Sequence, residues 1–206
     1  MKEHKIFAAG YDVVLTGIEK KVLGRRRAAL LGGLTGTVLD VGAGTGVNLP
    51  YFKAATQVVM AEPDGAMRAK ITPKLGQASV PIELSDAPAE ALPFPDGHFD
   101  AAVCTLVLCT VPDPEASLAE IHRVLKPGGT LVVLEHVEAP AGAKLKPWQT
   151  RLQPLWFHLA AGCHLNRDTE TAVQKAGFTF TSVDRFRELP PFAPISPMLQ
   201  GVATKA

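Results

Sequence analysis

The stretch TVLDVGAGTGVN, residues 37–48, decides the fold of this chain. It joins a run of β-branched and apolar residues to three glycines at alternate positions, after which a helix can begin. Glycine adopts positive φ and lets a ligand contact the backbone with no Cβ in between. A loop of this kind at a strand end, below the free N–H groups of the next helix, suits the polar end of a nucleotide-like cofactor.

The spacing of the glycines separates this loop from two other phosphate- and nucleotide-binding loops. A nicotinamide-binding loop has the pattern G-x-G-x-x-G, and a phosphate loop ends in Gly-Lys-Ser or Gly-Lys-Thr. Here the pattern is G-x-G-x-G, Asp40 lies two positions before it, and no lysine follows. The spacing therefore disfavours a nicotinamide-dependent oxidoreductase. Measured binding of reduced nicotinamide would restore that hypothesis.

Length and composition indicate one globular domain. The chain has 206 residues, of which 47% are hydrophobic and 20% charged, and its formal net charge of +1 gives no field that would recruit nucleic acid. The apolar stretch near the start of the sequence is too short and too polar for a signal peptide. No apolar run approaches the length of a membrane span. Three unevenly spaced cysteines argue against a disulfide framework, so we expect a cytoplasmic protein.

Strand-like and helix-like segments alternate along the chain. Apolar strands without polar alternation, each followed by a helix, predict a Rossmann-like α/β fold with a parallel sheet covered on both faces. The last two strands have no helix between them, which predicts a closing antiparallel pair. The expected strands are 37–41, 57–61, 81–84, 99–106, 130–136, 178–187 and 195–204, and the expected helices are 4–17, 18–32, a short one after Asn48 and Pro50, 66–75, 115–125, and two within 145–161 and 169–176.

Two further strand ends carry groups that suit a nucleotide. Ligands of open α/β sheets lie beyond the carboxyl ends of the strands. Glu62 follows Gly42 by 20 residues, where a carboxylate can accept both hydroxyls of a ribose. Alternatively, Glu62 has a structural role, in which its negative charge is stabilised by the N-terminus of the following helix. The segment 87–90 offers backbone groups for an adenine edge, although an ordinary surface loop explains it as well.

Four segments in order resemble the class I S-adenosylmethionine-dependent methyltransferases: VLDVGAGTG (38–46), EP (62–63), AEALPFPDGHFD (89–100) and EIHRVLKPGG (120–129). The resemblance covers residues 37–136 and implies a seven-stranded, mostly parallel sheet with an antiparallel last strand. It also implies a helical lid at 1–33, a cofactor-binding core at 37–136 and acceptor-side helices with the final hairpin at 144–206. The S-adenosyl-L-methionine site implied in this way consists of Tyr11, Asp40, Gly42, Ala43, Gly44, Gly46, Asn48, Glu62, Pro63, Met67, Ala89, Glu90, Cys104 and Thr105.

A narrower resemblance concerns the methyl acceptor. Residues 103–111, 134–137 and 148–167 are similar to the thiol S-methyltransferases among the methyltransferase-like membrane proteins, which carry an N-terminal apolar anchor that we do not expect here. A small or lipophilic thiol is therefore the first candidate. A phospholipid amine, a quinone or another small molecule methylated on carbon or oxygen, and a non-catalytic nucleotide-binding module are the alternatives.

The acceptor side offers two histidines as catalytic candidates. His136 follows the expected fifth strand at the ligand edge, and an imidazole there can accept a proton from a thiol. His158 lies in the expected aromatic helix, near Arg167. The alternative for His136 is a histidine satisfied by hydrogen bonds to Glu135 or to the backbone.

Several other residues have both a functional and a structural explanation. Cys104 and Cys109 can line the methyl-transfer face or pack in the core, and Trp148, Trp156 and Phe157 can cover the acceptor or pack. A zinc site made of Cys104, Cys109, Cys163 and His164 is disfavoured because the C-x-x-C spacing is missing, so no metal is expected. Arg25, Arg26 and Arg27 can meet an anionic lipid surface in a weak peripheral contact, or form a solvated helix face.

Overall fold

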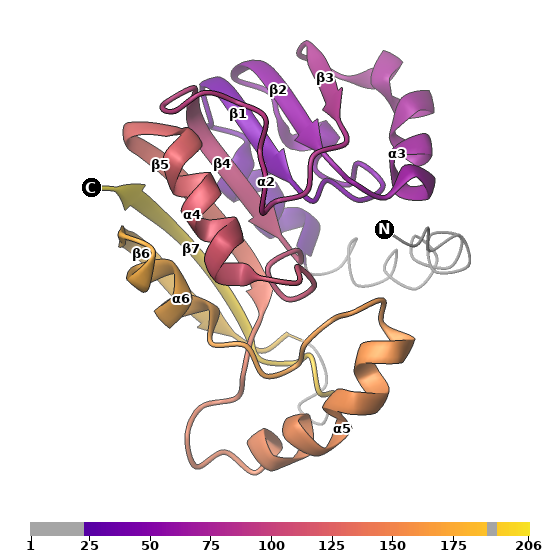
Figure 1. The fold of residues 1–206 in the computed structure, drawn as a ribbon, viewed down its shortest axis with the longest axis vertical. Helices are drawn as coiled ribbons and strands as arrows, with labels where there is room; N and C mark the ends of the chain where they lie inside the picture. Colours follow the sequence, from indigo (N-terminus) through magenta and orange to yellow (C-terminus); the bar gives the residue numbers. More distant parts are fainter. Residues whose placement is uncertain (1–22, 189–192) are drawn as a thin grey trace.

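The computed structural model describes residues 23–188 and 193–206, which form a seven-stranded sheet (Figure 1). The strand order is β3-β2-β1-β4-β5-β7-β6. Strands β1 to β5 pair in parallel, and β7 runs antiparallel to both β5 and β6. This confirms the mostly parallel sheet with an antiparallel last strand. The bounds are β1 Gly36–Val41, β2 Ala55–Ala61, β3 Ile82–Ser85, β4 Phe99–Thr105, β5 Leu125–His136, β6 Phe178–Phe186 and β7 Met198–Lys205.

Helices cover both faces of the sheet. Leu118 of α4 (Pro114–Val124) and Val173 of α6 (Thr169–Lys175) belong to one core, together with Leu39 and Val133. The opposite face buries residues of α2 (Gly24–Leu31) and α3 (Gly65–Ile71) in a second core. Because successive strand side chains point to opposite faces, Asp40 lies on the α2 side of β1.

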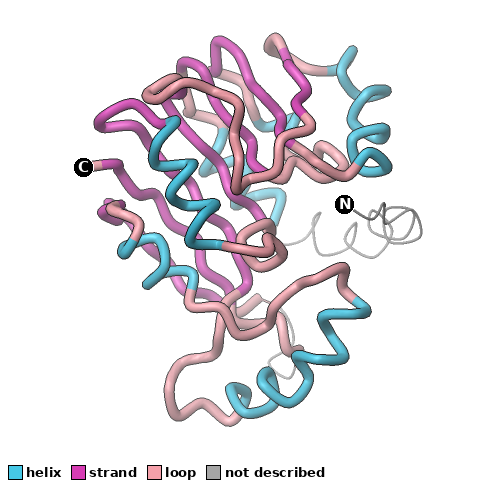
Figure 2. The backbone as a smooth tube through the Cα atoms, in the orientation of Figure 1, coloured by secondary structure: helices cyan, strands magenta, loops and turns pink. Residues whose placement is uncertain are grey.

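Helix α5 (Leu145–Leu159) lies apart from the helices that cover the sheet (Figure 1). Loops at both of its ends connect it to β5 and to α6 (Figure 2). These loops carry the chain past the carboxyl ends of the parallel strands, so α5 stands on the side of the sheet where a ligand is expected. Among the described helices, none combines the length and the apolar character needed to cross a bilayer.

The observed elements differ from the expected ones at several ends. The helix expected at 66–75 is α-helical only to Ile71 and continues as the 3-10 helix η3 (Thr72–Gln77), because Pro73 lacks an N–H for the α-helical pattern. Strand β4 ends before Leu106, whose φ is 57°, and β5 already begins at Leu125. The short helix after Asn48 is η2 (Leu49–Tyr51), and β7 starts at Met198 rather than at 195. The helix expected at 4–17 lies outside the described residues.

Candidate active site

The glycine loop follows β1 and takes a conformation that needs glycine. Gly42, Gly44 and Gly46 have φ values of 60°, 59° and 80°. A Cβ on Gly42 would lie 2.1 Å from Cγ2 of Val107, so packing of the protein itself excludes a side chain there. A Cβ on Gly44 would meet only a backbone oxygen at 3.9 Å, so open space lies above this residue. The buried Ala43 between them anchors the loop, and the space at Gly44 is left for a ligand.

The carboxylate of Glu62 ties the end of β2 to the glycine loop. Its Oε2 accepts the Gly44 N–H at 2.8 Å, and its Oε1 accepts the Asp64 N–H at 2.8 Å. A carboxylate has about four acceptor positions, so two remain for the hydroxyls of a ribose. Burial raises the pKa of Glu62 above its ordinary value. Asp64, rather than Glu62, caps α3 by accepting the N–H groups of Ala66 and Met67. Pro63 precedes this cap.

Four buried polar side chains form a network beside the loop. Asn48 Nδ2 donates to Asp40 Oδ1 at 2.7 Å and to Thr105 Oγ1 at 3.0 Å. Arg27 donates to Asn48 Oδ1 and, at 2.5 Å, to Thr105 Oγ1. Among the described residues, Asp40 Oδ2 has no hydrogen-bond partner. Burial raises the pKa of Asp40 to about 7. Oδ2 of Asp40 is enclosed by protein and presents no surface to a ligand.

The burial of Arg27 corrects the expectation for the arginine run. Arg27 is 3% exposed, and Arg26 forms ion pairs with Asp184 and Glu188 while its guanidinium lies 3.4 Å from the centre of the Phe186 ring. Two of the three arginines therefore face the protein, and Arg25 is the exposed one.

Arg27 is also the site residue that the sequence analysis missed. Leu23, Arg27 and Leu31 recur every four residues, so the helix period places Arg27 on the same buried stripe as the two leucines. This spacing is the signal in the sequence that could have identified it.

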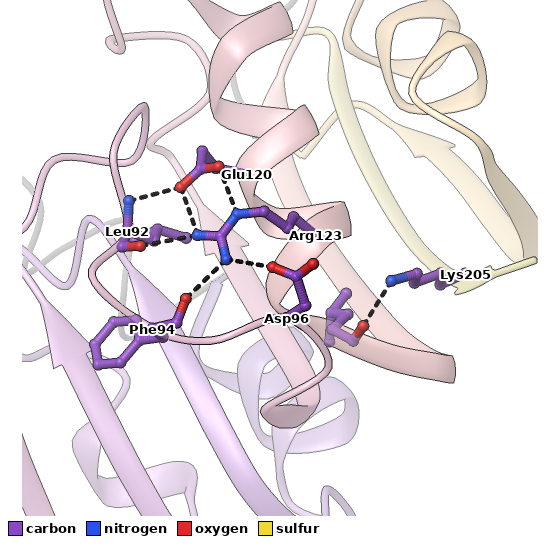
Figure 3. Close-up of polar contacts among 7 residues, drawn as sticks. Leu92, Phe94, Asp96, Glu120, Arg123 and Lys205 are labelled. Carbon is purple, nitrogen blue, oxygen red and sulfur yellow. Dashed lines mark hydrogen bonds and ion pairs between the residues drawn. The ribbon is translucent and has the colours of Figure 1, made fainter.

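The segment 92–96, which follows the expected adenine contact at 87–90, is held firmly against α4. Arg123 donates to the carbonyl oxygens of Phe94 and Leu92 at 2.8 and 2.9 Å and to Asp96 Oδ1 at 2.8 Å (Figure 3). Glu120 binds the same guanidinium with both oxygens and also accepts the Leu92 N–H at 2.9 Å. Glu120 and Arg123 of the segment EIHR therefore hold residues 92–96 in place.

The residues expected at the adenine end have mixed placements. Ala87 and Ala89 are buried, and Glu90 accepts the Asp113 N–H at 3.3 Å at the start of α4. Cys104 is a correction: its side chain is fully buried in the core on the α4 side, and burial raises the pKa of its thiol well above the ordinary value. Only its backbone belongs to the ligand edge. Tyr11 lies outside the described residues.

A second group of chemically active side chains lies at the end of β5. His136 Nε2 is 2.9 Å from Cys163 Sγ, and the thiol of Cys109 joins them, so that the three ligand atoms all lie within 4.8 Å of one another. All three residues are buried. The hydrogen bond between the side chains of Cys109 and Cys163 raises the pKa of Cys109. The same bond, together with the contact to His136, lowers the pKa of Cys163. We call Cys109, His136 and Cys163 the Cys-His cluster.

The turn that carries Cys109 is fixed from two sides. Glu135 Oε1 accepts the N–H groups of Val107 and Leu108 at 2.9 and 3.0 Å. Arg167 donates to the carbonyl oxygen of Leu108 and, at 2.7 Å, to that of Val111. Glu135 therefore holds this turn and does not orient the imidazole of His136. Arg167 binds backbone carbonyl groups instead of a methyl acceptor.

The structure does not bring the second catalytic candidate to the Cys-His cluster. His158 is exposed on α5, with its ring packed edge-on against Phe157. Trp148 is 58% exposed, whereas Trp156 is partly buried with its indole nitrogen enclosed. The zinc site that the sequence disfavours contains two of the three cluster residues, Cys109 and Cys163. It contains Cys104 and His164 in place of His136.

Known proteins share both the sequence and the fold. The methyltransferase domain family matches residues 39–133. Thiol S-methyltransferase TMT1B of Rattus norvegicus is 36% identical over 174 residues, which are 82% of this chain and 70% of the relative. Phosphatidylethanolamine N-methyltransferase of Cereibacter sphaeroides is 34% identical over 120 residues, 57% of this chain and 59% of the relative. A solved geranyl diphosphate methyltransferase in complex with SAM has a TM-score of 0.74 at 15% identity, over 96% of this chain and 91% of that one, a likeness of fold.

Proposed function

This chain belongs to the S-adenosylmethionine-dependent methyltransferases, and we propose that its methyl acceptor is the sulfur atom of a small or lipophilic thiol. The similarity to the thiol S-methyltransferase of Rattus norvegicus supports the proposal because it extends over 82% of the chain, well beyond the cofactor-binding segments. This similarity over most of the chain is the observation that carries the proposal.

The cofactor-binding part of the mechanism follows from the described residues. When bound, S-adenosylmethionine supplies a methyl group on a positively charged sulfur. Glu62 offers its two remaining acceptor positions to the ribose, and the space above Gly44 receives the chain of the cofactor. Holding donor and acceptor in line contributes up to ~7–11 kcal/mol to such a transfer.

Charge favours a thiol over a lipid amine. A thiol is methylated as the thiolate, an anion, whereas an amine approaches as a cation at neutral pH. Residues 144–165 contain no aspartate or glutamate but include Lys144, Lys146 and Arg151. Residues 144–165 therefore offer no carboxylate to a cationic head group, and Glu138, just before them, is paired with Lys146 of α5.

We do not place the proton acceptor on His136 alone. The base role predicted from the sequence requires an imidazole nitrogen that meets the acceptor, and Nε2 of His136 contacts Cys163 instead. The base role stays a prediction.

The outer face of α5 supports a lipophilic acceptor and a peripheral membrane contact. Trp148, Leu152, Leu155 and Leu159 lie at helical spacing on one stripe, and they are 58%, 36%, 61% and 68% exposed. Apolar side chains exposed together mark a surface that meets lipid or a partner. A cytoplasmic location stays a prediction.

A matched acceptor panel tests the proposal. Octanethiol, octylamine and octylphenol would each be incubated with the protein and methyl-labelled S-adenosylmethionine, so that a similar alkyl tail is offered with three different nucleophiles. We expect label in the thioether alone. Label in the amine or the phenol ether, with none in the thioether, would contradict a thiol acceptor, and binding of the cofactor without transfer to any acceptor would favour a non-catalytic module.

A further inference from the structure

The Cys-His cluster has the composition and spacing of a metal site. Its three members come from three parts of the chain: the turn after β4, the last residue of β5 and the turn after α5. They meet with their ligand atoms within 4.8 Å of one another, and 2%, 4% and 7% of Cys109, His136 and Cys163 are exposed. We propose that these three side chains bind one Zn²⁺ ion and leave its fourth position open.

The ligand set selects zinc by its chemistry. Two thiolates and one neutral imidazole form a soft donor set that suits Zn²⁺. With Zn–S bonds near 2.3 Å and Zn–N bonds near 2.0–2.1 Å, the ligand atoms of a tetrahedral site lie about 3.5–3.8 Å apart. The three atoms here span a comparable space. The contact between His136 Nε2 and Cys163 Sγ, at 2.9 Å, has to open by about 0.6 Å, and a pair at the 4.8 Å limit has to close by about 1 Å.

The surroundings hold the ligands in place before a metal arrives. Cys109 is carried by the turn that Glu135 and Arg167 fasten, and His136 by strand β5, where it pairs with Met198 of β7. Gln153 donates to the carbonyl oxygen of Cys163 at 3.3 Å and so ties this turn to α5. Among the described residues, His136 Nδ1 has no hydrogen-bond partner, so binding of the metal at Nε2 would itself fix the tautomer.

Three protein ligands leave one position, and three-ligand zinc sites are those that bind a water or a substrate. This part of the inference rests on the proposed thiol acceptor. An acceptor thiol that takes the fourth position loses its proton to water as the Zn–S bond forms. The sulfur electron pair then attacks the methyl carbon, and the bond between that carbon and the cofactor sulfur breaks toward the cofactor. The neutral thioether is a weak zinc ligand and leaves.

The test measures metal binding directly. The full chain would be stripped with a chelator and titrated with Zn²⁺, and the Co²⁺ form would be examined for thiolate-to-metal charge-transfer absorption. We expect one ion per chain with a Co²⁺ band typical of thiolate ligation. Cys109→Ser, Cys163→Ser and His136→Asn should each weaken Zn²⁺ binding more than about 100-fold, because each removes a direct ligand rather than an outer partner.

Cys104→Ala is the matched control, since Cys104 is buried in the core outside the cluster and its variant should bind Zn²⁺ like the wild type. Circular dichroism would select the folded variants. Absence of Zn²⁺ binding by the folded, fully reduced wild type would overturn the site.

The same samples separate this inference from the proposed function. Thiol methylation that is equally fast with and without Zn²⁺ would overturn the role of the fourth position while leaving the acceptor assignment intact. Zn²⁺ binding without methylation of any thiol would support the metal site and count against the thiol acceptor.

Discussion

Replacement of Asp40 by asparagine should make the protein more stable at neutral pH. Asp40 is fully buried, and its pKa in the folded protein is about 7, against ~3.9 for an ordinary aspartate. The folded state therefore holds the proton more tightly than the unfolded state does. The stability that this group contributes is complete below pH ~4 and is lost as the pH rises to 7. Asparagine keeps the shape of the side chain and does not titrate.

The magnitude follows from the interval between the two pKa values. Each unit corresponds to ~1.4 kcal/mol, so the wild type should lose about 3 kcal/mol relative to Asp40→Asn between pH 5 and pH 8. Urea denaturation of both proteins at the two pH values measures this difference, in which the other titrating groups cancel. A stability difference that is the same at pH 5 and pH 8 would refute the raised pKa of the buried Asp40.

The remaining predictions concern the cofactor site. Glu62→Ala should weaken S-adenosylmethionine binding by ~1.5–3 kcal/mol in calorimetry, the scale of hydrogen bonds to a charged group. Glu83→Ala, at the exposed residue of β3, should leave the affinity unchanged, and equal affinities of the two variants would remove Glu62 from the site. Gly44→Val should abolish cofactor binding in a protein whose circular dichroism remains largely native, because the side chain enters the open space above the loop. Wild-type affinity of this variant would show that the loop is a structural turn and does not bind the cofactor. Arg27→Met should lower the free energy of unfolding by ~1.5–3 kcal/mol through the loss of its bonds to the buried network, and Arg25→Met by less than ~0.5 kcal/mol; equal effects of the two would place Arg27 outside the network.

The sequence predicts those parts of the site that lie at strand ends. The glycine loop and Glu62 each follow a strand directly, so their positions are determined once the strands and their parallel order are recognised. The contact between them, from Gly44 to Glu62, follows from that order because β1 and β2 are neighbours.

Contacts between segments far apart in the chain could not be predicted in this way. His136 and Cys163 meet only because the loops around α5 return the chain to the end of β5, and no spacing in the sequence encodes that path. The position of Arg27 beside Asn48 depends on how α2 packs on the sheet. The helix period shows that Arg27 is buried, but it does not show which polar groups it meets.

The most direct test of the account uses one acceptor that carries two nucleophiles. An alkyl amino thiol, with a sulfhydryl and a primary amine on the same chain, would be incubated with the protein and S-adenosylmethionine bearing a deuterated methyl group. Tandem mass spectrometry then locates the label. The account predicts a deuterated methyl group on sulfur and a free amine. A methyl group on nitrogen with the sulfhydryl intact would contradict it.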